Sequence, residues 1–183
     1  MPLLRPRLLY LLGCLVLAGV VHAQDVTGRW RVREGTIKYE VSHVLHGAVG
    51  QSSRVQGELD CRAAVCSVHL SVPVASFGSG HAERDGDARA LLESARFPLA
   101  EVRGTGRLLE PETAVVQGTV RLAGGQAALR PTRLRVERGW WSLRVRGQFA
   151  LSLAELGIAP PALLGVPISD TVWIYVDLHF AAR

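Results

Sequence analysis

Long runs of clustered lysine and arginine are missing from this sequence, although the formal net charge of the 183-residue chain is +5. Proteins that bind nucleic acids usually gather basic side chains in such runs or on one face. Nucleic acid is therefore not an expected partner. The weakly basic balance is instead compatible with transient contact with an anionic membrane surface.

The sequence also lacks an apolar run long enough to span a bilayer. The apolar run at the N-terminus, residues 8–21, has about 14 residues, whereas a spanning helix needs roughly 20. Arg5 and Arg7 precede it, and the small-residue site Val21-His22-Ala23 follows it. This order predicts a signal peptide over residues 1–23 that is cleaved near Ala23, with a retained membrane anchor as the alternative. Loss of the two arginines leaves the mature domain, residues 24–183, with a net charge of +3.

Cysteine is scarce, and only Cys61 and Cys66 lie outside the predicted leader. In an exported protein two such cysteines are expected to form a disulfide. Residues 55–60 and 67–74 both have the pattern of strands, so the bond would join the two ends of a hairpin turn. A zinc ribbon needs a second pair of ligands, and none is suitably spaced.

No nucleophile stands in a recognisable catalytic context. Ser76-Phe77-Gly78-Ser79-Gly80 lacks the glycine two places before the serine that a nucleophile elbow requires. His81, Glu83 and Asp85 are close in sequence, but in a solvated loop they are weak evidence for a metal site. Asp85 is better explained as a cap at the start of a helix. We predict neither enzymatic activity nor a metal site.

Alternation of apolar and polar residues with period two is the main pattern in the chain, and it is typical of strands with one buried face. Turn-rich pieces such as Glu137-Arg138-Gly139 separate the alternating segments, as in a meander of hairpins. Weaker strands are expected over residues 114–122 and 134–136. The apolar faces of the clearest segments are Ile37, Tyr39, Val41, His43 and Leu45; Val68, Leu70, Val72 and Val74; Leu143, Val145, Phe149, Leu151 and Leu153; and Val172, Ile174, Val176, Leu178 and Phe180.

Two segments break this pattern. Residues 85–96 carry Ala88, Leu91, Leu92 and Ala95 at helical spacing and predict a short amphipathic helix that ends before Phe97-Pro98. Residues 156–167 predict an apolar loop or a turn of helix. Because no repeat or linker divides the chain, we expect one all-β domain of about eight strands with one short helix.

Four stretches in this order resemble the YceI-like family of bacterial periplasmic proteins. The first is Tyr39-Glu40-Val41-Ser42-His43 with Val49-Gly50 and Val55-Gln56-Gly57. The second is Val74-Ala75-Ser76-Phe77 with Arg84-Asp85, Leu91-Leu92 and Phe97-Pro98. The third is Gln117-Gly118-Thr119-Val120-Arg121-Leu122-Ala123-Gly124, and the fourth is residues 153–158 followed by Asp170-Thr171-Val172. Val102 departs from the family, which has an aromatic residue there.

The resemblance implies an antiparallel lipocalin-like barrel that binds a long isoprenoid or another lipid chain in its lumen, in the periplasm and without a cofactor. A barrel of about eight strands holds either packed side chains or one small ligand. The alternative is therefore a structural or interaction domain with a filled core, dimeric through an outer face that bears Trp140 or Trp173. The expected ligand-lining residues are Ile37, Tyr39, Val41, His43, Leu45, Phe77, Leu91, Leu92, Phe97, Trp141, Leu143, Val145, Phe149, Val172, Ile174 and Val176.

His43 and the adjacent tryptophans each have two interpretations. His43 is either a hydrogen-bonded core histidine or a contact for a ligand head group. If Trp140 and Trp141 lie on one strand, their side chains point to opposite faces. We therefore expect Trp141 in the interior, and Trp140 on the outside, where it covers a surface or meets a partner.

Overall fold

A computed structural model describes residues 26–42, 47–109, 112–163 and 166–183. The predicted signal peptide, residues 1–23, lies outside the described residues, and so do His43 and Leu45. Within the described part of the chain, no helix is long and apolar enough to cross a membrane.

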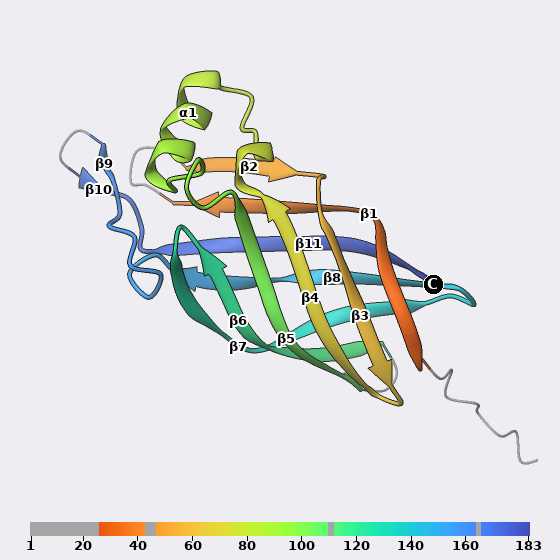
Figure 1. The fold of residues 1–183 in the computed structure, drawn as a ribbon. Helices are drawn as coiled ribbons and strands as arrows, with labels where there is room; N and C mark the ends of the chain where they lie inside the picture. The colour runs from red at the N-terminus through yellow and green to blue at the C-terminus, as the bar shows by residue number, and fades with distance from the viewer. Residues whose placement is uncertain (1–25, 43–46, 110–111, 164–165) are drawn as a thin grey trace, which may run out of the picture.

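Eight antiparallel strands close into a barrel, which confirms the predicted fold class (Figure 1). The order around the barrel is β1-β3-β4-β5-β6-β7-β8-β11, and pairing of β11 with β1 completes the circle. Four further pieces are short: β2 (Ala48–Ser52), β9 (Ala162–Leu163), β10 (Val166–Pro167) and the 3-10 helix η1 (Val74–Ser76). The long elements are β1 (Gly28–Val41), β3 (Gln56–Arg62), β4 (Val65–Pro73), α1 (Ala82–Leu91), β5 (Leu99–Leu109), β6 (Thr113–Leu122), β7 (Gly125–Arg138), β8 (Ser142–Ser152) and β11 (Thr171–Ala182).

Along the edge that does not face β11, strand β1 pairs with two different strands because it bends. Its first residues, Gly28 to Arg31, pair with β3, whereas Ile37 to Val41 pair with β2. A register shift between Val32 and Glu34 opens the bend, and Gly35 follows it. A Cβ at Gly35 would lie 2.8 Å from the Asp177 carbonyl oxygen, so only glycine allows β11 to approach this closely. The first alternating segment predicted from the sequence, which begins at Ile37, therefore includes only the last part of β1.

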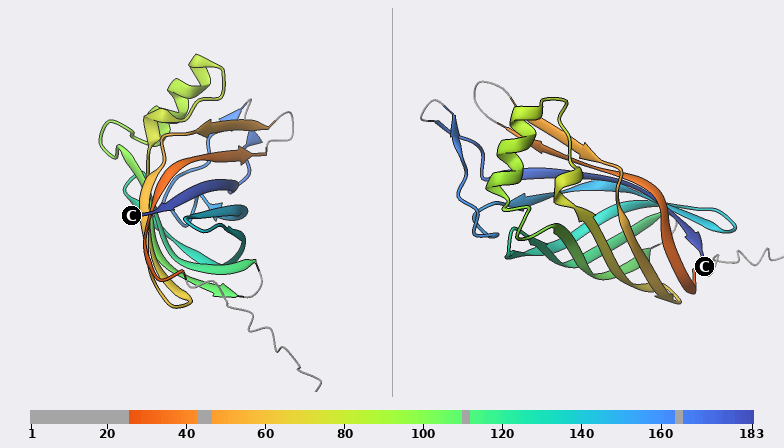
Figure 2. Two further views of the ribbon diagram at one scale, coloured as in Figure 1. Left: turned by 90° about the vertical axis from the view of Figure 1, so that its right-hand side faces the viewer. Right: turned by 45° about the horizontal axis from the view of Figure 1, so that its top comes forward.

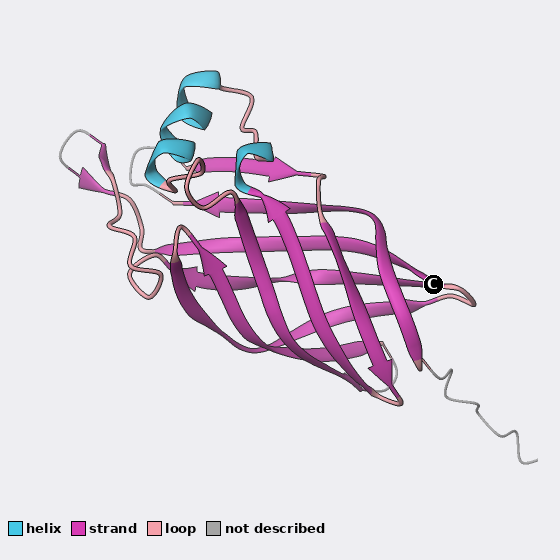
Figure 3. Ribbon diagram, in the orientation of Figure 1, coloured by secondary structure: helices cyan, strands magenta, loops and turns pink. Residues whose placement is uncertain are grey.

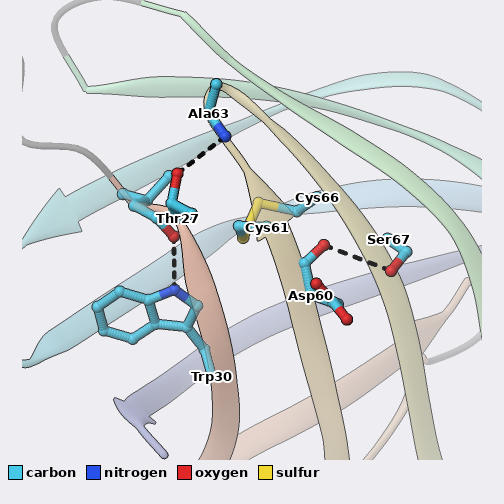
Figure 4. Close-up of a disulfide and its surroundings, with 8 residues drawn as sticks. Thr27, Trp30, Asp60, Cys61, Ala63, Cys66 and Ser67 are labelled. Atoms are coloured by element: carbon cyan, nitrogen blue, oxygen red, sulfur yellow. Dashed lines mark hydrogen bonds between the residues drawn. A yellow bond between two sulfur atoms is a disulfide. The ribbon is translucent and has the colours of Figure 1, made fainter.

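A disulfide joins β3 and β4 next to the turn that connects them (Figure 4). Cys61 and Cys66 are directly opposite each other on β3 and β4, and their sulfur atoms are bonded. The indole Nε1 of Trp30 donates to the Val26 carbonyl oxygen at 2.8 Å. Both cysteines and Trp30 belong to the largest buried cluster, with Leu143, Leu178 and Phe180. This packing closes one end of the lumen.

The opposite end carries the non-strand segments (Figures 2 and 3). The helix α1 begins three residues before the predicted start and ends five residues before the predicted end, because residues 92–96 form turns. The turn at Leu153 to Gly157 begins three residues before the predicted loop, residues 156–167, which contains the small β9–β10 hairpin. Leu156 packs with Ala127 of β7, and Glu155 pairs with Arg130 at 2.8 Å. The β7–β8 ladder has only four residue pairs, from Arg135–Arg146 to Arg138–Leu143. Beyond this ladder, the turn after β8 contacts β7 through the side chains of Leu156 and Glu155.

Candidate functional site

A cavity of about 750 Å³ occupies the barrel lumen. Its wall extends from Leu59, Cys66 and Phe180 near the disulfide to Tyr39, Phe77 and Leu92 below α1. All the barrel strands contribute inward side chains, and nearly all of these are Val, Leu, Ile, Phe or Ala. The volume falls in the range of about 300–1,000 Å³ that is usual for small-molecule sites. The lumen is therefore a long apolar chamber, closed at one end.

Most of the expected lining residues border this cavity, and those on strands follow the period-two alternation. Strands β1, β8 and β11 supply nine of them, and α1 and the residues that flank α1 and η1 supply the other three. The expected residues that line the cavity are Ile37, Tyr39, Val41, Phe77, Leu91, Leu92, Leu143, Val145, Phe149, Val172, Ile174 and Val176.

Two expected lining residues are elsewhere. Trp141 is 77% exposed, and it lies in the turn between β7 and β8, before β8 begins at Ser142. The prediction of an interior Trp141 was wrong because the two tryptophans are not on a strand, so strand alternation does not apply to them. Phe97 does not line the cavity either. Its ring fills the space above Gly124, where an added Cβ would be 2.6 Å from the ring edge.

Tyr39 is the main polar group among the inward residues of β1. Its ring lies over Gly50 of β2, where a Cβ would be 2.5 Å from it, so the glycine makes room for the tyrosine. The ring of Phe77 is 5.7 Å away, centre to centre, in a tilted arrangement that favours aromatic attraction. Burial raises the pKa of the Tyr39 hydroxyl, and the charge of Asp85 adds to this, while Arg84 opposes it. The hydroxyl therefore stays protonated at neutral pH and can donate a hydrogen bond.

The mouth of the lumen is charged, in contrast to its interior. His81, which precedes α1, borders the cavity. So do these residues of the helix: Glu83, Arg84, Asp85, Asp87, Ala88, Arg89 and Leu91. Both charge signs are present, so the mouth is polar without a strong net field. An amphipathic molecule could place its apolar part in the lumen and its polar end here.

Asp85 fastens the loop before α1 and does not cap the helix. The residue at the N-cap position is His81, whose side chain makes no capping hydrogen bond. Asp85 lies in the first turn, and its Oδ1 accepts the Ser79 N–H at 2.8 Å. The hydroxyl and the backbone N–H of Ser79 lower the pKa of Asp85. No group of three His, Cys, Asp or Glu side chains is arranged to hold a metal among the described residues.

The rim beside α1 is held by hydrogen bonds between β2 and the η1 segment. Gln51 and Gly78 exchange two backbone hydrogen bonds of 3.0 Å. The buried hydroxyl of Ser52 lies 2.6 Å from that of Ser76. These contacts fix the segment that carries Phe77 and leads into α1, so one side of the mouth is rigid.

The opposite wall, from β5, β6 and β7, was missed as a source of site residues. Val102, Leu108, Val116, Val120 and Leu129 line the cavity there. Alternation on β6 could have identified Val116 and Val120. On β5 the inward row is interrupted by Gly104 and Gly106, which weakens the apolar period from which a strand is predicted.

Solved structures with the same fold support the architecture. A crystal structure of BcnA from Burkholderia cenocepacia superimposes with a TM-score of 0.70, at 13% sequence identity, over 79% of this chain and 95% of that one. A polyisoprenoid binding domain from Saccharophagus degradans, implicated in plant cell wall breakdown, gives 0.67 at 18% identity, over 84% and 98%. The YceI protein of Campylobacter jejuni gives 0.60 at 13% identity, over 73% and 84%.

Comparison with curated protein sequences found no match. The family model described as YceI-like domain, in contrast, matches residues 24–180. The match begins directly after the predicted leader and includes every strand of the barrel except the last residues of β11. The chain therefore belongs to the YceI-like domain family.

Proposed function

We propose that this protein binds a long hydrophobic ligand, an isoprenoid or another lipid chain, in the barrel lumen and performs no chemistry on it. The observation that carries the proposal is the apolar cavity of about 750 Å³ inside a closed barrel. A domain with a filled core, the competing possibility, would not leave a space of this size, because protein interiors are close-packed.

The lumen favours a chain-like ligand for energetic reasons. Each methylene transferred from water to an apolar wall contributes roughly 0.8 kcal/mol. Ten buried methylenes would therefore contribute on the order of 8 kcal/mol, part of which offsets the lost freedom of the ligand. The twelve inward residues predicted from the sequence, together with Val102, Val116, Val120 and Leu129, would supply the contacts.

The charged mouth suggests the orientation of the ligand. The apolar tail would point toward Cys66 and Phe180, and the polar end would remain near Tyr39 and α1. The helix α1 and the segment from Leu153 to Leu163 would act as lids, since both stand at the open end and neither is part of the barrel ladder.

The periplasm is the proposed location, after cleavage of the leader near Ala23. The pattern of the first 23 residues supports export, and the Cys61–Cys66 disulfide suits an oxidising compartment. Membership of the YceI-like family and the fold shared with a polyisoprenoid binding domain support both the location and the class of ligand.

Extraction of the purified protein with organic solvent, followed by mass spectrometry, tests whether the lumen carries a ligand. We expect an isoprenoid or lipid in a fixed ratio to the protein. Empty extracts from several independent preparations, combined with failure to bind any fluorescent fatty-acid analogue, would contradict the proposal and favour the filled core.

A matched pair of variants locates the binding site. Val120 is buried and faces the lumen, whereas its neighbour Thr119 on the same strand does not border it. Val120→Trp should occupy the middle of the cavity and abolish binding of the fluorescent fatty acid, and Thr119→Trp should leave binding unchanged. Near-ultraviolet circular dichroism and thermal unfolding check that both variants fold. Equal binding by two folded variants would place the site outside the lumen.

A further inference from the structure

Two adjacent tryptophans form the most exposed apolar feature among the described residues. Trp140 is 88% exposed and Trp141 77%, while the next most exposed of the large apolar side chains there, Val65, reaches 50%. Both lie at the tip of the β7–β8 hairpin, outside the ladder. Neither side chain lines the lumen or belongs to a core cluster. Large apolar side chains kept in water at such cost usually mark an interaction surface.

The tip is held rigidly in spite of its exposure. Gly139 donates its N–H to the Ser142 carbonyl oxygen at 2.8 Å, which closes the turn. Ala182 donates its N–H to the Trp141 carbonyl oxygen at 3.1 Å, which ties the turn to the end of β11. The two indoles are therefore presented by a fixed backbone, and little conformational entropy of the chain is lost when they bind.

Arginine surrounds this end of the barrel. The residue after Ala182 is Arg183, whose N–H donates to the Arg29 carbonyl oxygen at 2.9 Å. The exposed basic side chains of the adjoining rows are Arg29, Arg31, Arg62 and Arg183, and the acidic ones are Glu58 and Asp60. Within the described residues, Arg29 makes the one ion pair of this group, at 3.5 Å to Asp60. Four arginines against two acidic side chains leave these rows with a small excess of positive charge.

The described chain also starts at this end. Val26 is buried beside Trp30, and β1 runs from there toward the mouth (Figure 1). The β7–β8 tip and the C-terminus stand at the same end of the barrel, opposite α1 and the mouth (Figures 1 and 2).

We infer that the Trp140–Trp141 tip, together with the arginines beside it, is a docking surface for an anionic phospholipid membrane. Tryptophan is favoured at the boundary between head groups and acyl chains, where its ring is apolar and its N–H is solvated. Each arginine near an anionic surface strengthens binding by about fivefold. Docking in this way directs the mouth of the lumen away from that membrane, by roughly the length of the barrel.

Fluorescence with vesicles tests the inference on the protein purified from the periplasm of an expressing bacterium. In a Trp173→Phe variant only Trp30, which is buried, and the tip remain as emitters. Vesicles of phosphatidylethanolamine and phosphatidylglycerol should shift the emission to shorter wavelength, and brominated phosphatidylglycerol should quench it. Vesicles of phosphatidylcholine alone should have a much weaker effect.

Co-sedimentation with the same vesicles gives the magnitude. Trp140→Ser with Trp141→Ser should reduce the partition coefficient by roughly tenfold or more. Arg29→Gln with Arg31→Gln should reduce it only for vesicles that contain phosphatidylglycerol, and added salt should have the same effect. Trp173→Ser, which removes an exposed tryptophan from the wall of the barrel, is the matched control and should bind as the unchanged protein does.

The result that overturns the inference is vesicle binding that is absent or is unaffected by the double tryptophan variant. A double variant that instead changes the molar mass in solution would assign the tip to contact between two copies and would equally overturn it. Binding of a fluorescent fatty acid should be the same in all these variants. The docking inference and the proposal of lipid binding in the lumen are therefore tested independently.

Discussion

Arg144 and Asp177 form the best-aligned ion pair on the outer face of the barrel. Arg144 Nε lies 2.9 Å from one carboxylate oxygen and Nη2 lies 2.7 Å from the other, a bidentate geometry across β8 and β11. The hydrogen bonds from Arg144 lower the pKa of Asp177 below 3.8, the ordinary value for an aspartate. Both side chains are more than a third exposed, so solvent reduces the contribution to stability.

Asp177→Asn should lower the free energy of unfolding at pH 7 by about 0.5–1 kcal/mol. Because the folded-state pKa is lowered, this stabilisation is complete above the unfolded pKa and is lost as the pH falls through the folded one. Urea unfolding at pH 7 and again below about pH 3 measures this. Asp60→Asn is a control, since Asp60 makes only a single 3.5 Å contact with Arg29. A stability difference that persists in acid would contradict the assignment.

Individual residues were predictable where one periodicity determined their position. Ile174 and Val176 were placed on the cavity wall because β11 alternates from end to end. The prediction for Trp141 was wrong because the sequence did not show that β8 begins at Ser142. Strand alternation does not apply to a residue in the turn before the strand. Tyr39 was expected to be inward, but its position over Gly50 depends on β2, whose five residues alternate too briefly to predict.

At the scale of elements, α1 is weakly stabilised by its own sequence. None of its residues is buried, and Gly86 stands in its interior. The sequence predicted a helix here from Leu91 and Leu92, although the helix ends at Leu91 and Leu92 follows in a turn. A helix with few buried contacts opens easily, which is a property expected of a lid.

Gly86→Ala should stiffen α1 without any other change. A Cβ at Gly86 would have nothing within 4 Å, and alanine stabilises a helix over glycine by about 0.5–1 kcal/mol. If α1 must open before a ligand leaves, release of a fluorescent fatty acid should slow by about two- to fivefold. Gly86→Pro should accelerate release, because proline breaks the helix.

Stopped-flow displacement measures these release rates, and amide hydrogen exchange reports the local stability of α1. Gly86→Ala should slow both ligand release and amide exchange in α1, and Gly86→Pro should accelerate both. Unchanged release in both, despite altered exchange, would show that ligands leave by a route that does not involve α1.

At the scale of the whole molecule, the barrel holds its cavity because its two ends are built differently. The disulfide end is packed by Trp30, Phe180 and Leu143, whereas the mouth is bordered by a helix and turns. The apolar interior follows from the alternation of the strands. Alternation does not show that the interior is hollow. The inward positions of Gly104 and Gly106 and the bend at Gly35 become apparent only when the strands are assembled.

Gly106 provides a way to shorten the cavity from the closed end. It faces the lumen opposite Cys66, and a Cβ there would lie 3.5 Å from Val116 and 3.7 Å from Val68, which is ordinary contact. Gly106→Phe should therefore fold and fill the lumen near the disulfide. Thr105→Phe, on the exposed side of the same strand, is the matched control.

A lumen that binds a chain along its length should then discriminate by chain length. Each methylene excluded by the new ring costs roughly 0.8 kcal/mol, or about fourfold in affinity. Gly106→Phe should weaken binding of a long-chain fatty acid by at least about tenfold and leave that of a short-chain one nearly unchanged. Titration of both fatty acids against a fluorescent probe gives the two affinities, and urea unfolding checks stability. Equal losses for both chains would indicate that ligands do not extend to the disulfide end.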